Sequence, residues 1–178
     1  MSIKLDFSKM SLMDALDLAA LIEVEACRRY ELFASQLGSR GADDAGSVFA
    51  AMVINESKHG EDLAKRRMAL FGDKAPNVSI DDIFDVEAPD VTAPSSNMSQ
   101  FRAYQIALMS EEKAYAFYDG ALRYVTHPEV KTLFEELREE EAEHVQMLKD
   151  IMAKLPREAA NDLEDLDEDK YRRERSSY

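Results

Sequence analysis

The stretch VKTLFEELREEEAEHVQMLKDIMAKL, residues 130–155, decides how this chain folds. Its apolar residues follow one another in alternating steps of four and three, which places them in a single stripe along an α-helix. Between Leu137 and Leu148 the two stripe positions are occupied by Glu141 and His144 instead of apolar residues. Because burying an unpaired carboxylate costs several kcal/mol, we expect a compensating partner at this point of the helix.

Three further segments carry stripes of the same kind, and polar residues interrupt each of them. The four stripes predict α-helices over residues 11–38, 43–71, 98–125 and 128–155. The residues that interrupt the first three stripes are Glu23, then Glu56 and His59, and then Glu111. Tyr115 shares the stripe of Glu111, so we expect it to face the core. Neighbouring acids outside the stripes are interpreted as surface charges; they include Glu112, Glu139, Glu140 and Glu143.

The composition indicates one helical domain whose main partner is neither nucleic acid nor an anionic membrane. The sequence has 178 residues, no tryptophan and six glycines, which favours helix. Nucleic acid and anionic membranes would be repelled by the net charge of −14, whereas a cation would be attracted. The single cysteine, Cys27, excludes an intrachain disulfide and is expected to be a small buried residue. Without a membrane-length apolar run or a signal-peptide pattern, we expect a cytoplasmic protein.

The segment 73–96 lacks a helical pattern and contains three prolines, Pro76, Pro89 and Pro94. A connection of this length suits a bundle whose second and third helices run parallel, so that the chain must cross the full length of the bundle. We therefore predict an all-α four-helix bundle over residues 1–156, made of two helical hairpins joined by a long crossover. Within the crossover the sequence allows a short helical turn at 81–84. Residues 157–178 are interpreted as a polar, charged and solvated tail.

The two predicted hairpins repeat the same polar residues in the same order. Each has Glu-x-x-Ala-x-x-x-Tyr followed by Glu-x-x-His, and the intervals between the two glutamates are 33 and 30 residues. The first set is Glu23, Ala26, Tyr30, Glu56 and His59, and the second is Glu111, Ala114, Tyr118, Glu141 and His144. If a pseudo-twofold axis relates the hairpins, four glutamates and two histidines meet in the middle of the bundle.

These six residues predict a dinuclear metal site. Two divalent ions would supply four positive charges, and the oxygen and nitrogen ligands suit iron or manganese, with no thiolate to favour zinc. One Glu-x-x-His alone is commonly a surface pair, but two of them, each in phase and preceded by a stripe glutamate, favour metal binding. The arrangement matches the template of ferritin-like di-iron and di-manganese carboxylate proteins. Tyr30 and Tyr118 are interpreted either as core aromatics or as hydrogen-bond partners of the ligand carboxylates.

Three stretches resemble the rubrerythrin-like proteins of the ferritin-like superfamily. They are EVEACRRYELFASQ at 23–36, EEKAYAFY at 111–118 and HPEVKTLFEELREEEAEH at 127–144, and the resemblance extends over residues 11–155. It implies bridging carboxylates from Glu56 and Glu141 and terminal carboxylates from Glu23 and Glu111. It also implies that His59 and His144 are ligands of the two iron ions, for which manganese, a mixed pair, or zinc in the purified protein are alternatives.

The resemblance further implies a redox-active di-iron oxidoreductase that reacts with hydrogen peroxide or O2. Because one cysteine cannot build the four-cysteine iron site of full-length rubrerythrins, the electron donor is expected to be external. Ala114 stands where the family has a seventh carboxylate, so the ligand set resembles the six-ligand ferroxidase site of bacterioferritins. The alternatives are a ferroxidase for iron storage or delivery, and a metal-binding bundle without turnover. A homodimer or higher homo-oligomer is expected, with hairpin exchange between protomers as one possible arrangement.

Overall fold

The computed structural model describes residues 5–38, 44–79, 86, 89 and 94–156. In these residues the chain forms four helices and no strand: α1 (Leu12–Leu37), α2 (Ala45–Phe71), α3 (Gln100–Leu122) and α4 (Pro128–Lys154). The predicted all-α four-helix bundle is therefore confirmed. The helical turn expected at 81–84 and the tail at 157–178 lie outside the described residues, so the domain boundary at 156 stays a prediction.

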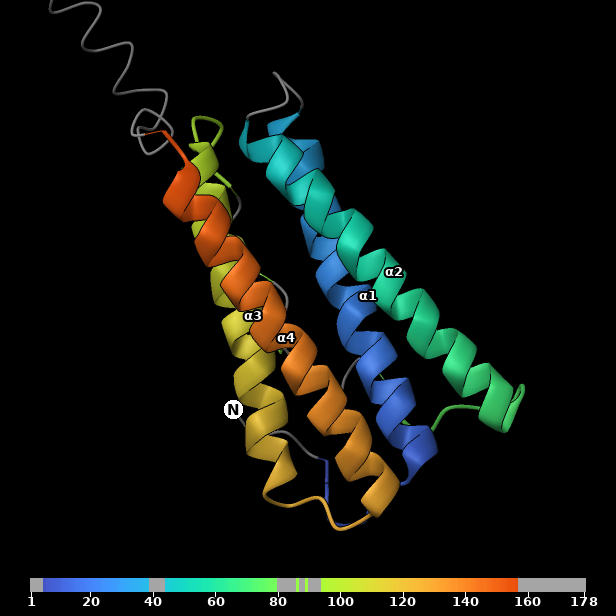
Figure 1. Ribbon diagram of the computed structural model, residues 1–178. Coiled ribbons are helices and arrows are strands. Elements are labelled where there is room, and N and C mark those ends of the chain that lie inside the picture. The colour runs from blue at the N-terminus through green and yellow to red at the C-terminus, as the bar shows by residue number, and fades with distance from the viewer. Residues whose placement is uncertain (1–4, 39–43, 80–85, 87–88, 90–93, 157–178) are drawn as a thin grey trace, which may run out of the picture.

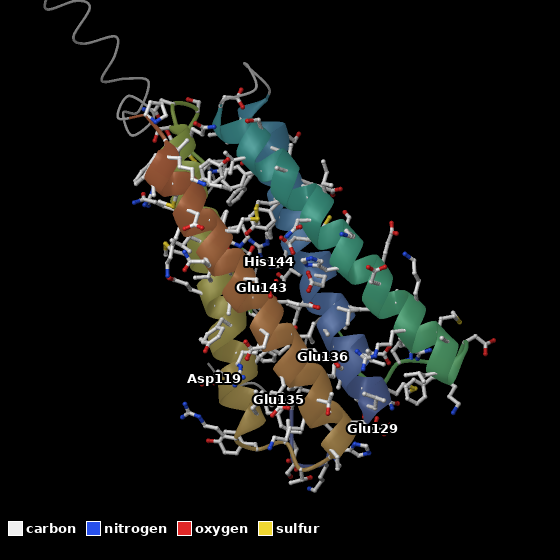
Figure 2. All side chains as sticks on the ribbon, in the orientation of Figure 1. Asp119, Glu129, Glu135, Glu136, Glu143 and His144 are labelled. Carbon is white, nitrogen blue, oxygen red and sulfur yellow. The ribbon has the colours of Figure 1, made fainter. Side chains whose placement is uncertain are left out.

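The helices form two antiparallel hairpins, α1 with α2 and α3 with α4 (Figure 1). Contacts between the hairpins are fewer, and most of them are made by α2 with α3. In Figure 1 the colours show that α2 and α3 both run from the top to the bottom of the view, while α1 and α4 run upwards. The end of α2 and the start of α3 therefore lie at opposite ends of the bundle, as predicted from the length and prolines of the segment between them. Figure 2 shows side chains of both hairpins filling the space between the ribbons.

Local sequence explains where most of the helices begin and end. Ser11 and Asp14 form the predicted capping box at the start of α1, and side chains also cap the starts of α2 and α3. Gly38 and Gly72, with φ of 66° and 63°, follow the last residues of α1 and α2. The third helix ends at Leu122 and not at Val125 as predicted, because the chain there turns back to the carbonyl of Ala121.

The buried face of α3 differs from the predicted stripe. Tyr115 was expected in the core, but it is 38% exposed. The buried apolar residues of α3 are instead Tyr118 and the alanines Ala103, Ala107, Ala114 and Ala121. Small side chains let this helix approach its neighbours closely, and larger residues such as Tyr104 lie at the edges of the contact. Glu111 and Tyr118 lie on both the predicted and the observed face.

The apolar core consists of two clusters. One includes Leu16, Ile22 and Leu137, and the other includes Ala26, Phe49 and Leu148. Glu23 and Glu141 lie in sequence between members of the two clusters, on α1 and α4 respectively. The polar residues therefore form a layer between two apolar halves of the core.

Arg67 holds the end of α2 against α1 and the start of the crossover. Its guanidinium donates hydrogen bonds to the Asp17 carboxylate on α1, with 2.8 Å between Nε and Oδ1, and to the carbonyl oxygens of Gly72 and Lys74. Both charged side chains are only 11% exposed, so solvent screens this ion pair little, and it joins the end of α2 to α1. None of the helices in the described part of the chain is long and apolar enough to span a membrane.

Candidate metal centre

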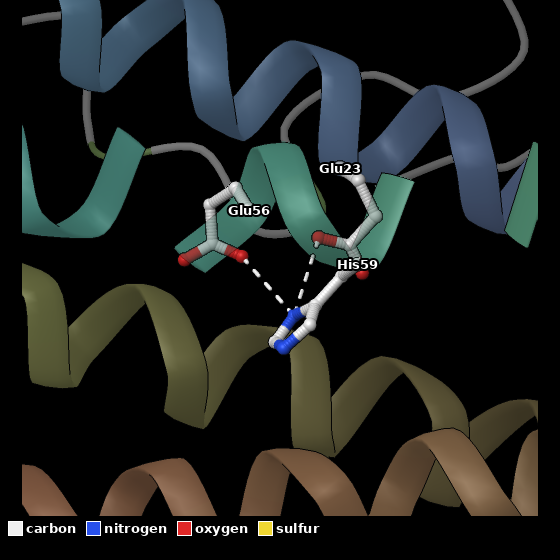
Figure 3. Close-up of side chains that lie close together, drawn as sticks. All are labelled: Glu23, Glu56 and His59. Atoms are coloured by element: carbon white, nitrogen blue, oxygen red, sulfur yellow. Dashed lines mark ion pairs between the residues drawn. The ribbon is translucent and has the colours of Figure 1, made fainter. Parts of the chain in front are cut away.

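The first hairpin brings Glu23 of α1 next to Glu56 and His59 of α2 (Figure 3). Nδ1 of His59 lies 3.7 Å from Oε2 of Glu56 and 4.0 Å from Oε2 of Glu23. Both carboxylates are buried, with 2% and 1% of Glu23 and Glu56 exposed, whereas the His59 side chain is 22% exposed. The spacing of three residues on α2 places Glu56 and His59 on one helix face, opposite Glu23.

The second hairpin repeats this arrangement with Glu111 of α3 and with Glu141 and His144 of α4. Nδ1 of His144 lies 3.2 Å from Oε2 of Glu111 and 3.6 Å from Oε2 of Glu141. Glu111 is fully buried, and only 3% of Glu141 is exposed. The sequence repeat is therefore also a repeat in three dimensions, with one carboxylate from the first helix of each hairpin and a Glu–His pair from the second.

The two groups of three residues meet in the middle of the bundle. The rings of His59 and His144 stack with centroids 4.8 Å apart and planes within 2° of parallel. Burial raises the pKa of Glu23 well above its usual range, and the charges of Glu56 and then Glu141 raise it further. Because Glu141 belongs to the second hairpin, carboxylates of both hairpins repel one another within one region. The structure thus brings together all six residues that the stripes selected.

Protonation of this region follows from its burial. Burial is the main cause that raises the pKa of Glu141 to about 8; His144 opposes this rise and Glu111 adds to it. For His144, burial disfavours the charged imidazolium, but hydrogen bonds with Glu111 and Glu141 outweigh it and raise the pKa to about 10. Without metal, the cluster therefore holds protons that an exposed glutamate or histidine would release at neutral pH.

The ligand atoms fit two divalent cations. Within each group of three, one carboxylate oxygen from each glutamate and one imidazole nitrogen lie within 4.8 Å of one another. Each of the four glutamates also has one buried oxygen without a hydrogen-bond partner in the described structure. Buried polar atoms of this kind are costly unless they are paired. Two cations would pair them, and the mixed oxygen and nitrogen donors suit iron or manganese.

The other residues singled out in the sequence lie around this centre in different ways. Tyr30 and Tyr118 are fully buried; the Tyr30 ring stacks on Phe49, and the Tyr118 ring meets Phe134 edge to face. Ala114, where the family resemblance implies a seventh carboxylate, is also fully buried. Cys27 was expected to be buried but is only half-buried, with its Sγ 3.2 Å from Oγ of Ser57.

A hollow between α2 and α4 was missed in the sequence. It is lined by His59, by Glu140, which was interpreted as a surface charge, and by Glu136, which the sequence analysis did not single out. An ion pair of 2.7 Å between Arg66 and Glu136 joins the two helices at its rim. Since these two residues are 70 positions apart, no local pattern could have revealed their contact.

Comparisons with known proteins agree with this geometry. The family described as Rubrerythrin matches residues 14–165, so the chain belongs to the rubrerythrin family. The crystal structure of an uncharacterised conserved protein from Magnetospirillum magnetotacticum MS-1 is similar, with a TM-score of 0.64 and 28% sequence identity. The similarity covers 83% of this chain and 97% of that one. A search of curated proteins found no match.

The helix phase around Glu111 leads to a first prediction. Replacing Glu111 with alanine removes a fully buried carboxylate from the second group, and we expect the variant to lose at least one of the two bound ions. Glu112→Ala is the matched control, because Glu112 is exposed and pairs with Lys149 at 3.2 Å. This variant should bind two metal ions, as the wild type should. Metal analysis after anaerobic loading with ferrous ion measures the metal content of the two variants. Equal metal content in the two variants would contradict the assignment.

The stability of the metal-free protein should depend on pH in a defined direction. The raised pKa of Glu141 contributes stability that is complete below the unfolded value of 4.5 and is lost as pH rises through about 8. The contribution of His144 is complete below 6.5 and is lost as pH rises through about 10. We therefore expect the free energy of unfolding to fall between about pH 5 and about pH 10.

Urea unfolding of the metal-free protein, followed by circular dichroism across this range, measures the effect. In the Glu141→Gln variant the free energy of unfolding should fall less as pH rises, because the amide is neutral at every pH. A Glu141→Gln variant whose stability falls as steeply as that of the wild type would show that Glu141 does not carry the effect.

Proposed function

We propose that this protein is a redox-active di-iron carboxylate protein that reduces hydrogen peroxide or O2. The observation that carries the proposal is the convergence of two Glu–Glu–His groups, one from each hairpin, in the buried middle of the bundle. Membership of the rubrerythrin family supports a di-iron carboxylate protein as the class. When bound, two ferrous ions would supply the two electrons needed to reduce peroxide to two waters, with uptake of two protons.

In this proposal each residue has a definite role toward the metals. His59 and His144 would each bind one ion, and Glu23 and Glu111 would each bind one ion as terminal ligands. Glu56 and Glu141 would bridge both ions, as the family resemblance implies. Every ligand would have to be deprotonated to bind, so loading the site would release the protons that the raised pKa values retain.

The residues around the ligands would orient them and exclude water. The apolar clusters on the two sides of the polar layer keep bulk water away from it and lower the local dielectric. We further propose that the hydroxyls of Tyr30 and Tyr118 support ligand carboxylates by hydrogen bonds, since both side chains are buried on the helices that carry Glu23 and Glu111.

Electrons would have to come from a separate donor. This sequence has one cysteine and cannot hold a four-cysteine iron site, so a second protein or a small reductant would restore the ferrous state. We also propose a homodimer or higher homo-oligomer, and a cytoplasmic location in which such a reductant is available.

Rapid mixing tests the proposed reaction. The anaerobic protein loaded with ferrous ion is mixed with hydrogen peroxide or with O2, and iron oxidation is followed by absorbance. We expect at least one oxidant to oxidise the bound iron faster than it oxidises free ferrous ion in the same buffer. Glu112→Ala should react as the wild type does. Oxidation no faster than that of free ferrous ion with either oxidant would refute the proposal.

A further inference from the structure

The hollow between α2 and α4 lies beside the proposed metal site. It has a volume of about 160 Å³, and we call it the α2–α4 hollow. Its inner wall is formed by Leu63, Leu133 and Leu137, which are 7%, 1% and 4% exposed. Of the six proposed ligands, His59 is the one that lines it. This half-buried imidazole therefore lies where the hollow meets the polar layer.

Buried carboxylate oxygens lie directly behind His59. Oε2 of Glu23 is 4.0 Å from its Nδ1, and Oε2 of Glu56 is 3.7 Å away. Both glutamates have an oxygen with no hydrogen-bond partner in the part of the chain described. An ion that reached His59 through the hollow would therefore meet carboxyl oxygens that have no hydrogen-bond partner in the described structure.

The rim of the α2–α4 hollow is acidic. It contains Asp62, Glu136 and Glu140 against one cation, Arg66. Asp62 pairs with Lys65 at 3.0 Å, and Glu136 pairs with Arg66 at 2.7 Å. Within the described residues, Glu140 is the rim carboxylate for which no ion pair is found. A cation that approaches the rim therefore meets Glu140 as its available anionic contact.

Arg66 repels the cations that the rim carboxylates attract. Its side chain is 42% exposed, and its partner Glu136 is 48% exposed, so this ion pair between α2 and α4 is of the weak kind that opens readily. Figure 2 shows Glu136 on α4 between Glu129 and His144. Arg66 also lines a second, wider hollow together with Glu129, so it stands between that hollow and the one beside His59. The positive charge of Arg66 repels divalent cations and neutralises Glu136 while the two side chains are paired.

We infer that the α2–α4 hollow is the port through which divalent metal ions enter the site, with Glu140 as first contact and Arg66 as the residue that limits the rate. The inference rests on the proposed metal site, because the hollow would be the entrance to that site. Charge on the rim favours a cation as the species that passes. An uncharged oxidant would be neither attracted by Glu140 nor repelled by Arg66.

The rate of metal loading tests the inference without the redox reaction. Anaerobic metal-free protein is mixed with Co²⁺ in a stopped-flow instrument, and the cobalt absorption bands report both the rate and the final amount bound. Glu140→Gln should slow loading several-fold, and Arg66→Met should accelerate it, with two ions bound at equilibrium in both variants. Both differences should shrink at high ionic strength, because salt screens charges on an exposed rim.

Two controls match these changes in charge. Glu139→Gln removes one negative charge next to Glu140 from an exposed side chain that pairs with Arg138 and does not line the hollow. Arg123→Met removes one positive charge from an exposed ion pair with Asp119 on α3. Both controls should load at the wild-type rate.

The outcomes separate the port from the site. If Glu140→Gln and Glu139→Gln load at the same rate and bind two ions, the port is refuted while the metal site stands. If Glu140→Gln binds fewer ions at equilibrium, Glu140 is a ligand and its role as an entry contact is refuted. If the wild-type protein binds no Co²⁺, the proposed site fails and the port with it.

Discussion

Mutual repulsion of four buried carboxylates is the constraint on which the rest of this structure depends. Glu23, Glu56, Glu111 and Glu141 are each 3% exposed or less. Burial raises the pKa of Glu23, and the charges of carboxylates from both hairpins raise it further. A protein core tolerates such a group only if protons or cations neutralise it. Two apolar clusters, one on each side of the polar layer, supply the hydrophobic stabilisation that offsets its cost.

The division into hairpins explains how one bundle provides two equivalent half-sites. Each hairpin gives a lone glutamate from its first helix and a Glu–His pair from its second. Most helix contacts lie within the hairpins, and Arg67 fixes the first hairpin to the start of the crossover. Packing is therefore more extensive within the hairpins than between them, and the polar residues of the two hairpins meet where the His59 and His144 rings stack.

Much of this arrangement could be predicted from the sequence because it depends on local periodicity. The starts of α1, α2 and α3 follow from side-chain caps, and the ends of α1 and α2 follow from glycines. The phase of each stripe separates Glu111, which is fully buried, from the exposed Glu112. The crossover followed from the length and prolines of the segment before α3. These features are encoded within one or two turns of helix, so a single sequence is enough to read them.

The features that were missed depend on contacts between distant segments. The core face of α3 was misjudged at Tyr115, because the periodic pattern gave weight to large residues while the close helix contact is made by alanines such as Ala107 and Ala114. The rim of the α2–α4 hollow was missed because Arg66 and Glu136 meet across two helices. Glu140 lies outside the apolar stripe of α4, so the sequence pattern gave it no role, yet it lines the hollow together with His59.

The central claim is that the six converging residues hold two metal ions, and counting those ions tests it most directly. The protein is loaded with ferrous ion under anaerobic conditions and freed of unbound metal. Bound iron per chain is then measured alongside the optical spectrum after oxidation. The account predicts two iron ions per chain, one for each Glu–Glu–His group. Retention of no iron by the wild-type chain, or an iron content that does not change when Glu56 and Glu141 are both replaced by alanine, would contradict it.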